Sequence, residues 1–425
     1  MSSTSSSEGT ITETICIETI KPTTPTFISR SQLPSRSNNK GGSLWSVLKK
    51  SIGKDLTRVT VPLTFNEPLS FLQRLAEYME YVSLIKQALK AKDPVKRMEF
   101  IAAFALSTLA SNSSRLTKPF NPLLCETYEL SKPELGFEFI AEQVSHHPPI
   151  SAFYARGSPG SNDEDFEFYG NIEPRIKFWG RSLEDTPIAN FTLVLKPFNE
   201  KYTWQGISCS VHNLYMGKMY ISLNGTMNIK CVGSDLQTEI KFAGASKSGP
   251  DTVLYGEIIQ GKNAIRVLYG NWTEYIASTS ISMYLDMKHQ WKKEYRNVEK
   301  SGKNDLITLF PDSSMIWRVH SKPPGNKDYY NMTYFALMLN EKLPDDSVKL
   351  PSTDARFRPD IRLMEEGEMD AASTEKERLE EKQRAKAKSS KPRLPPQWFS
   401  DDKNGSFIFN GNYWKRDFSK SDDIY

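Results

Sequence analysis

The sequence lacks the two features that would direct a chain into or across a membrane. Its first residues, MSSTSSSEGT, have no basic start followed by an apolar run, and no stretch approaches about 18 uninterrupted apolar residues. Neither a secretory signal nor a transmembrane helix is therefore expected, and we predict a cytoplasmic protein.

Cysteine and histidine are both scarce. Four cysteines are scattered along the chain: Cys16, Cys125, Cys209 and Cys231. They form no CxxC pair, so neither a disulfide framework nor a zinc ribbon is expected, and reduced, partly buried thiols fit the pattern better. Two of the 5 histidines are adjacent, at His146 and His147. That pair therefore calls for an explanation.

A strong excess of charge of one sign is also missing. Lys and Arg number 55 against 51 Asp and Glu, a net charge of +4, and 38% of the residues are apolar. This composition is typical of a soluble globular protein and argues against a nucleic-acid partner, which would require a strong positive field. A weak attraction to anionic surfaces is all that the basic excess predicts.

The chain divides into three expected segments. Residues 1–43 are rich in Ser, Thr, Pro and Asn without a sustained apolar period, which predicts a disordered tail. In residues 44–66, Leu44, Leu48 and Ile52 share one face of a short basic helix, and an extended stretch follows. This helix could lie on a membrane, close over an apolar pocket or simply pack on the core. Residues 67–425 are expected to form one domain.

Within that domain, the pattern indicates helices around a large sheet. Apolar residues at helical spacing predict helices over 69–90 and 94–111, and composition predicts another over about 371–390. Between residues 130 and 281, aromatic and β-branched runs separated by turn residues predict about ten consecutive antiparallel strands. So many strands in one sheet tend to curl and close, which favours a barrel wide enough to need a ligand or a plug inside.

The segment EQVSHHPPISAFYARG places the adjacent histidines directly before two prolines. Neighbouring side chains of a regular strand point to opposite faces, so His146 and His147 could not both enter one site within such a strand. Neither Pro148 nor Pro149 can donate to a β-ladder, so we expect the strand to end at about Ser145 or His146. Both rings could then converge at the rim of the sheet.

Four roles for the pair remain open on these residues alone. A metal needs three or four ligands, yet His212, His289 and His320 stand apart from one another. A catalytic base needs a nucleophile and an orienting acid, and no nucleophile elbow is present. A hydrogen-bonded structural pair at a strand end is the third role. Binding of a phosphate, which would favour the protonated rings, is the fourth.

Two other segments carry groups that would suit a phosphate. In TEKERLEEKQRAK, Lys376, Glu380 and Arg384 are four residues apart and so share one face of the predicted helix. In TKPFNPLLCETYEL, Lys118 and Asn121 are bracketed by prolines, which present both side chains from a stiff loop. A helix rich in Lys, Glu and Arg is more often a solvated surface, so the phosphate assignment requires these segments to meet the histidines in space.

Taken together, KPFNPLLCETYEL, EQVSHHPPISAFYA, FWGRSLE and EKERLEEKQR, in this order and spacing, resemble the oxysterol-binding-protein family of lipid-transfer proteins. The resemblance runs from about Lys54 to the C-terminus and is greatest to the short members that handle sterols and phosphoinositides. One departure is Cys125, which stands where the family usually has glycine.

The resemblance implies a mainly β (α+β) fold, namely a large, nearly closed antiparallel β-barrel with an apolar tunnel, an N-terminal lid and flanking helices. By match to the family's motifs, the phosphates of phosphatidylinositol 4-phosphate would be held by His146, His147, Lys118, Lys376 and Arg384. Glu380 would assist at the inositol, and Asn121 and the lid would lie near the headgroup. The lid residues are Leu56, Thr57, Arg58, Val59, Thr60 and Val61.

The function implied is lipid transfer without catalysis, cofactor or metal. A sterol, or in some members phosphatidylserine, would occupy the same tunnel in exchange for phosphatidylinositol 4-phosphate, with peripheral contact to anionic membranes. An acyl chain of about 16 methylenes costs about 13 kcal/mol to expose to water, so a carrier needs an enclosing cavity and a lid. The alternative is a lipid sensor or scaffold that binds the same ligands without net transfer.

Overall fold

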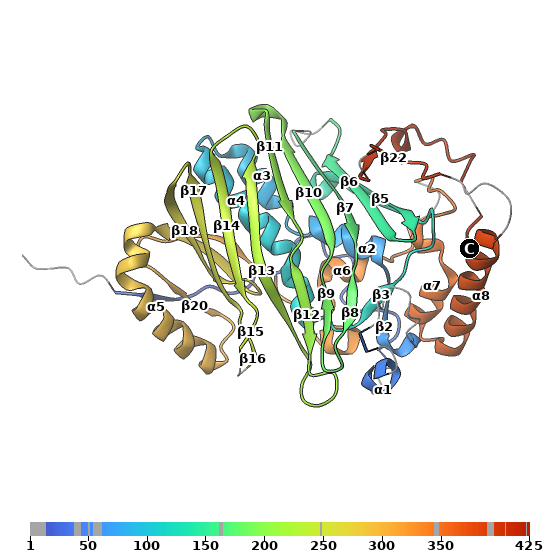
Figure 1. Cartoon of the computed structure of the whole chain (residues 1–425), viewed down its shortest axis with the longest axis horizontal. Coiled ribbons are helices and arrows are strands. Elements are labelled where there is room, and N and C mark those ends of the chain that lie inside the picture. The colour runs from blue at the N-terminus through green and yellow to red at the C-terminus, as the bar shows by residue number, and fades with distance from the viewer. Residues whose placement is uncertain are drawn as a thin grey trace, which may run out of the picture.

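The computed structural model describes residues 14–37, 44–49, 52, 53, 62–160, 165–246, 249–343, 348–388, 395–403, 405–421 and 423–425. Its centre is a 15-stranded sheet in which every pairing is antiparallel (Figure 1). The strands follow one path in the order β21 (Ser314–Arg318), β19 (Tyr275–Ser280), β18 (Asn263–Asn271), β17 (Val253–Gln260), β14 (Leu236–Ala243), β13 (Tyr220–Cys231), β11 (Glu200–Gln205), β10 (Ile188–Leu195), β7 (Phe166–Glu173), β6 (Pro149–Gly157), β5 (Phe137–His146) and β4 (Thr127–Lys132). The predicted large antiparallel sheet is therefore confirmed.

Three short strands branch from this path. They are β8 (Ile176–Phe178), β9 (Leu183–Asp185) and β12 (Ser208–His212), which pair with one another through β9 and join the sheet where β12 pairs with β13. Two-stranded pairs lie outside the sheet: β2 (Asn66–Ser70) with β3 (Lys118–Phe120), β15 (Ala245–Ser246) with β16 (Gly249–Pro250), and β22 (Phe399–Asp401) with β23 (Phe407–Phe409).

One face of the sheet is covered by helices from the N-terminal half. In β7 the buried Phe166, Phe168 and Ile172 alternate with partly exposed residues, the period of two that a sheet with one buried face requires. Behind the strands in Figure 1 lie α3 (Ser83–Lys90) and α4 (Pro94–Ala110). The ring of Phe104 in α4 packs edge-to-face on Phe168, with centroids 5.1 Å apart. Helices and strands thus share one core.

The helix predicted over 69–90 is broken into α2 (Phe71–Ala76), a 3-10 turn and α3. The break turns Tyr81 so that its ring packs edge-to-face against Trp317, with centroids 5.2 Å apart, and stacks on His320. Apolar spacing alone could not predict this change of direction, because both halves keep a buried face. The predicted helix over 94–111 is confirmed as α4, whose Asp93 N-cap accepts from the backbone N–H of Val95 and Lys96.

The remaining helices lie at the two ends of the strand order (Figure 1). At one end, α5 (Ile281–Ser301) packs beside β18, β19 and β20 (Leu306–Leu309). At the other end lie α7 (Pro359–Glu366) and α8 (Met369–Lys388), which confirms the helix predicted over about 371–390. The short helices are α1 (Leu44–Leu48) and α6 (Tyr334–Met338). Among the helices that the structure describes, none is long and apolar enough to cross a membrane.

The prediction of a disordered tail over 1–43 is wrong for residues 14–37. The strand β1 (Cys16–Thr19) pairs antiparallel with β20, and Ile15 is buried beside it. Further along, Arg30 donates to the backbone oxygen of Leu337 and forms an ion pair with the buried Glu365. Composition did not reveal these contacts, because their partners lie about 300 residues away in the sequence. Residues 1–13 and 38–43 lie outside the described residues.

Candidate functional site

The two adjacent histidines lie at a hairpin, where β5 ends at His146 and β6 begins at Pro149. A shift of register between Gln143 and Ser145 interrupts the regular alternation just before the turn. The two imidazole rings lie beside each other, with centroids 4.4 Å apart and planes at 50°. His146 is partly buried and His147 is exposed. The rings thus converge, as the interruption of the strand by the prolines led us to expect.

Helix α8 is joined to this hairpin by Gln383. The side-chain oxygen of Gln383 accepts from the backbone N–H of Leu124 at 2.8 Å, and its nitrogen lies 3.1 Å from Nε2 of His146. A backbone N–H can only donate, so the amide oxygen must face Leu124 and the amide NH₂ must face His146. Nε2 of His146 therefore accepts, and its proton is on Nδ1. The sequence reasoning missed Gln383, because nothing local marks a glutamine whose partners are brought together only by the fold.

The row of charged side chains predicted on one face of α8, which we call the α8 ladder, is present. Lys376 Nζ lies 3.0 Å from Glu380 Oε1, and Arg384 Nη1 lies 3.9 Å from Glu380 Oε2. The exposed fraction of the side chain rises along the helix, from 14% for Lys376 to 28% for Glu380 and 59% for Arg384. One carboxylate thus lies between two cations, and the outer cation extends into solvent.

Lys118 brings the proline-bracketed loop to the same place. It begins β3, which pairs with β2, and its backbone oxygen accepts from Asn66 Nδ2 at 3.0 Å. Burial lowers the pKa of Lys118 to about 8, nearby Lys376 adds to the lowering, and Glu380 opposes both effects. Lys118 and the α8 ladder therefore share one electrostatic environment, although 258 positions separate Lys118 from Lys376 in the sequence.

Asn121 is exposed, and its backbone oxygen accepts from Arg358 Nη1 at 2.9 Å. Arg358 is buried and also forms ion pairs with Glu126 at 2.8 Å and with Asp360 at 2.7 Å. This buried ion-pair network holds the loop that carries Asn121. The structure thus fixes the backbone at Asn121 and leaves its side chain toward solvent.

Cys125 follows in the same loop with a backbone φ of 67°, in the left-handed region. Its N–H donates to the backbone oxygen of Gln143 at 3.0 Å, which ties the loop to β5 shortly before the histidines. A side chain in this region costs about 1–2 kcal/mol, which glycine would avoid. Glycine, which the sequence resemblance led us to expect at this position, would adopt the conformation without that cost.

The predicted lid residues Leu56 to Val61 lie outside the described residues. The stretch before them is described at Ile52 and Gly53, and the N–H of Gly53 donates to the backbone oxygen of Phe178 at 2.8 Å. The helix α1 packs through Leu48 on Phe178 and Leu214. The chain therefore approaches the predicted lid along β8 and the β12–β13 loop.

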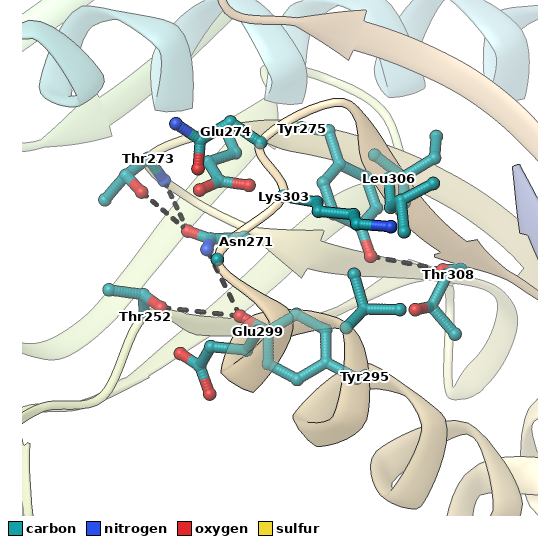
Figure 2. Close-up of a pocket in the computed structure, with 14 residues that line it drawn as sticks. Thr252, Asn271, Thr273, Glu274, Tyr275, Tyr295, Glu299, Lys303, Leu306 and Thr308 are labelled. Carbon is teal, nitrogen blue, oxygen red and sulfur yellow. Dashed lines mark hydrogen bonds between the residues drawn. The ribbon is translucent and has the colours of Figure 1, made fainter. Parts of the chain in front are cut away.

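A separate polar pocket of about 230 Å³ lies at the other end of the strand order, between the β18–β19 turn, the end of α5 and β20 (Figure 2). Some of its side chains bond to one another or to the backbone: Asn271 donates to the hydroxyl of Tyr295 at 3.1 Å, and Tyr275 donates to the backbone oxygen of Thr308 at 3.1 Å (Figure 2). None of the predicted site residues lines it. Within the part of the chain that the structure describes, no group of three His, Cys, Asp or Glu residues is arranged to hold a metal.

Known proteins are similar to this chain in sequence. The family model described as oxysterol-binding protein matches residues 43–418. The human oxysterol-binding protein-related protein 1 is 42% identical over 421 residues, covering 93% of this chain but only 44% of that relative, so the chain spans less than half of its length. The mouse oxysterol-binding protein-related protein 2 is 42% identical over 414 residues, covering 90% of this chain and 85% of the relative.

Solved structures agree with the sequence relatives. The Osh3 ORD of Saccharomyces cerevisiae, in complex with PI(4)P, superposes with a TM-score of 0.77 at 30% identity, covering 96% of this chain and all of that one. The Osh1 ORD domain in complex with cholesterol gives a TM-score of 0.77 at 32% identity, covering 93% of this chain and 94% of that one. The chain belongs to the oxysterol-binding protein family.

Proposed function

We propose that this protein binds a sterol or phosphatidylinositol 4-phosphate in a lidded tunnel and exchanges the two between membranes. The observation that carries the proposal is the meeting of the histidine hairpin with α8 at Gln383, beside the partly buried Lys118. Two relatives with similar structures were solved with PI(4)P and with cholesterol. These supply the ligand classes that the site is proposed to take.

The chemistry of the site suits a phosphate monoester. Such a group carries about −1.5 to −2 charges near neutral pH, which Lys118, Lys376 and Arg384 would offset while the two imidazoles donate to its oxygens. The amide of Gln383 would have to rotate away before His146 could present a proton from Nε2, because an amide NH₂ faces that atom now. Glu380 would orient the two cations of α8 and accept from an inositol hydroxyl.

The lipid tails would occupy the face of the sheet that the helices cover. We propose that the sheet curves into a nearly closed barrel with an apolar tunnel, over which residues 56–61 close with Asn121 nearby. Aromatic rings support this proposal: the half-buried Tyr78 packs edge-to-face on the half-buried Phe191 and on Phe153, with centroids 5.7 Å apart in each case. Half-buried rings such as Tyr78 and Phe191 offer apolar surface that an acyl chain or sterol would cover.

The protein is further proposed to be cytoplasmic and peripheral on anionic membranes, with a sterol as the second cargo and phosphatidylserine as the alternative. It is proposed to be a carrier and not an enzyme. The second candidate function is a sensor that binds the same lipids without moving them. The sensor would be the better description if binding to a partner protein prevented this protein from leaving the membrane.

The decisive experiment measures transfer between vesicles. Donor vesicles carry labelled phosphatidylinositol 4-phosphate and acceptor vesicles carry labelled sterol, and both labels are followed after addition of catalytic amounts of the full chain. A carrier moves many lipids per protein in opposite directions. A sensor stops at one lipid bound per protein, and that result would replace the proposal with the second candidate.

A further inference from the structure

Large apolar side chains are exposed together around α1 and the turns beside it. We name as the turn patch the residues Ile52, Trp179, Tyr215 and Met216, which are 54%, 55%, 61% and 77% exposed. Trp179 lies at the β8–β9 turn, and Tyr215 and Met216 lie in the β12–β13 loop. Scattered exposed apolar residues are ordinary in soluble proteins, so what matters is whether these four adjoin.

Three contacts show that they do. The backbone N–H of Leu214 donates to the oxygen of Arg181 at 3.2 Å, which holds the β12–β13 loop against the β8–β9 turn. The ring of Tyr215 packs edge-to-face on Trp45 of α1, with centroids 5.0 Å apart. A Cβ built on Gly180 would lie 3.7 Å from Cδ1 of Ile52, so that side chain reaches the β8–β9 turn. α1 and the β12–β13 loop lie at the same end of the molecule in Figure 1.

The patch is supported by a core of its own. Leu48, Phe178 and Leu214 are buried beneath it and form a small cluster separate from the main core. The indole N–H of Trp179 donates to Glu184 Oε2 at 2.8 Å, which fixes the ring at the tip of the turn while leaving most of it exposed. Two of the exposed rings are therefore held in place, Trp179 by Glu184 and Tyr215 by Trp45.

The charges around the patch have one sign. In α1 and residue 49 after it, the β8–β9 segment (residues 176–185) and the β12–β13 loop, every charged residue that is exposed in the described structure is basic: Lys49, Lys177, Arg181 and Lys218. The acids of these segments, Glu184 and Asp185, are only partly exposed and accept hydrogen bonds from Trp179 and the backbone of Arg175. An apolar centre with a basic surround matches a membrane that presents anionic headgroups above an apolar interior.

We infer that the turn patch is the surface that docks this protein on an anionic membrane, with Trp179 and Met216 entering the interface and the four basic residues contacting lipid phosphates. This inference rests on the proposed function and adds to it the two β-turns that act together with α1. An indole whose N–H is already satisfied is well suited to the headgroup boundary, because its apolar ring can enter without leaving a donor unpaired.

Flotation with liposomes tests the inference on the full chain. Vesicles of phosphatidylcholine with about 30% phosphatidylserine should bind the wild type, and Trp179→Ser combined with Met216→Ser should weaken binding about tenfold or more. Lys177→Gln combined with Lys218→Gln should weaken binding to anionic vesicles, lower its salt sensitivity and leave binding to neutral vesicles unchanged. The matched control is Leu285→Ser, which removes an equally exposed side chain (55%) from α5.

A second measurement follows the tryptophan itself. Brominated lipids should quench part of the fluorescence of the wild type, and Trp179→Phe should remove that part while flotation stays close to normal. If Trp179→Ser/Met216→Ser floats like the wild type, or if Leu285→Ser loses as much binding, the turn patch is not the docking surface. The inference also fails if the patch variants keep vesicle binding and instead lose a protein partner.

Binding of a soluble short-chain phosphatidylinositol 4-phosphate separates this inference from the proposed function. The patch variants should bind it like the wild type, because its headgroup site is made by β3, β5 and α8. If the wild type binds the short-chain lipid but no vesicle, the docking surface fails and the lipid site stands. If the wild type binds neither, the proposed function fails as well.

Discussion

Gln383 in α8 and His146 at the end of β5 face each other across 3.1 Å, with the glutamine amide donating to Nε2 of the imidazole. The amide oxygen of Gln383 accepts from the backbone N–H of Leu124, which fixes the other end of the amide group. One uncharged side chain thus couples the helix, the histidine hairpin and the loop that carries Lys118. Its amide also occupies Nε2 of His146, the nitrogen that we propose donates to the phosphate.

Replacing Gln383 tests this coupling. Gln383→Glu should keep the bond from Leu124 and hold His146 in its protonated form, but should weaken binding of short-chain phosphatidylinositol 4-phosphate about tenfold because it adds a negative charge beside the phosphate. Isothermal titration measures the affinity, and NMR of the imidazole reports its protonation. The control is Glu381→Gln on the same helix. Unchanged affinity in Gln383→Glu would mean that Gln383 does not adjoin the phosphate.

The histidine pair should discriminate between the two lipids. His146→Ala combined with His147→Ala should abolish extraction of phosphatidylinositol 4-phosphate from liposomes, because two donors to the phosphate are lost, while sterol uptake is spared. The extraction assay uses both labelled lipids side by side. His289→Ala, on the exposed surface of α5, is the matched control. Normal phosphoinositide extraction by the double variant would refute the site assignment.

Lys118 should make phosphoinositide affinity depend on pH in the alkaline range. Its pKa is lowered to about 8 by burial and by Lys376. A bound phosphate favours the charged amine, so binding takes up a proton above pH 8 and affinity should fall as pH rises, by up to about tenfold per pH unit. Lys118→Arg should keep its charge and flatten the profile between pH 7.5 and about 9.5. A wild-type profile as flat as that of Lys118→Arg would exclude Lys118 from the phosphate site.

The lowered pKa of Lys118 also affects the stability of the protein without a bound lipid. The unfolded chain holds its proton on Lys118 up to the ordinary lysine pKa near 10.5, whereas the folded chain releases it near 8. Lys118 therefore makes the folded state less stable below pH 8, and this loss is recovered as pH rises from about 8 to 10.5. Urea unfolding of the wild type and Lys118→Met over this range should converge at the alkaline end.

Cys125 offers a test of backbone strain. Cys125→Gly and Cys125→Ala both remove the buried thiol, but only glycine adopts a φ of 67° without strain. We expect the glycine variant to be more stable than the alanine variant by about 1 kcal/mol, the reverse of the usual order of these residues. Thermal unfolding of the two variants measures this difference. Equal stability, or a more stable alanine variant, would show that the loop relaxes around residue 125.

The parts of the site that sequence reasoning predicted depend on local rules. Helical period alone places Lys376, Glu380 and Arg384 on one face, and the loss of ladder donors at Pro148 and Pro149 allows the histidine rings to converge. Gln383 escaped prediction because it lies next to Arg384, off that face, and its partners come from two other segments. The same limit applies to residues 14–37, whose polar composition conceals a strand that pairs only in the folded chain.

That strand has a practical consequence for anyone who shortens the chain. A fragment starting at residue 44, where composition places the first folded segment, would lose β1 and Ile15 and uncover the backbone of β20 along Leu306–Leu309. Ile307 and Leu309, now buried, would lie beside a free strand edge, the arrangement that recruits other copies of a protein into aggregates. By pairing with β20, β1 thus covers a strand edge through which copies of the protein would otherwise associate.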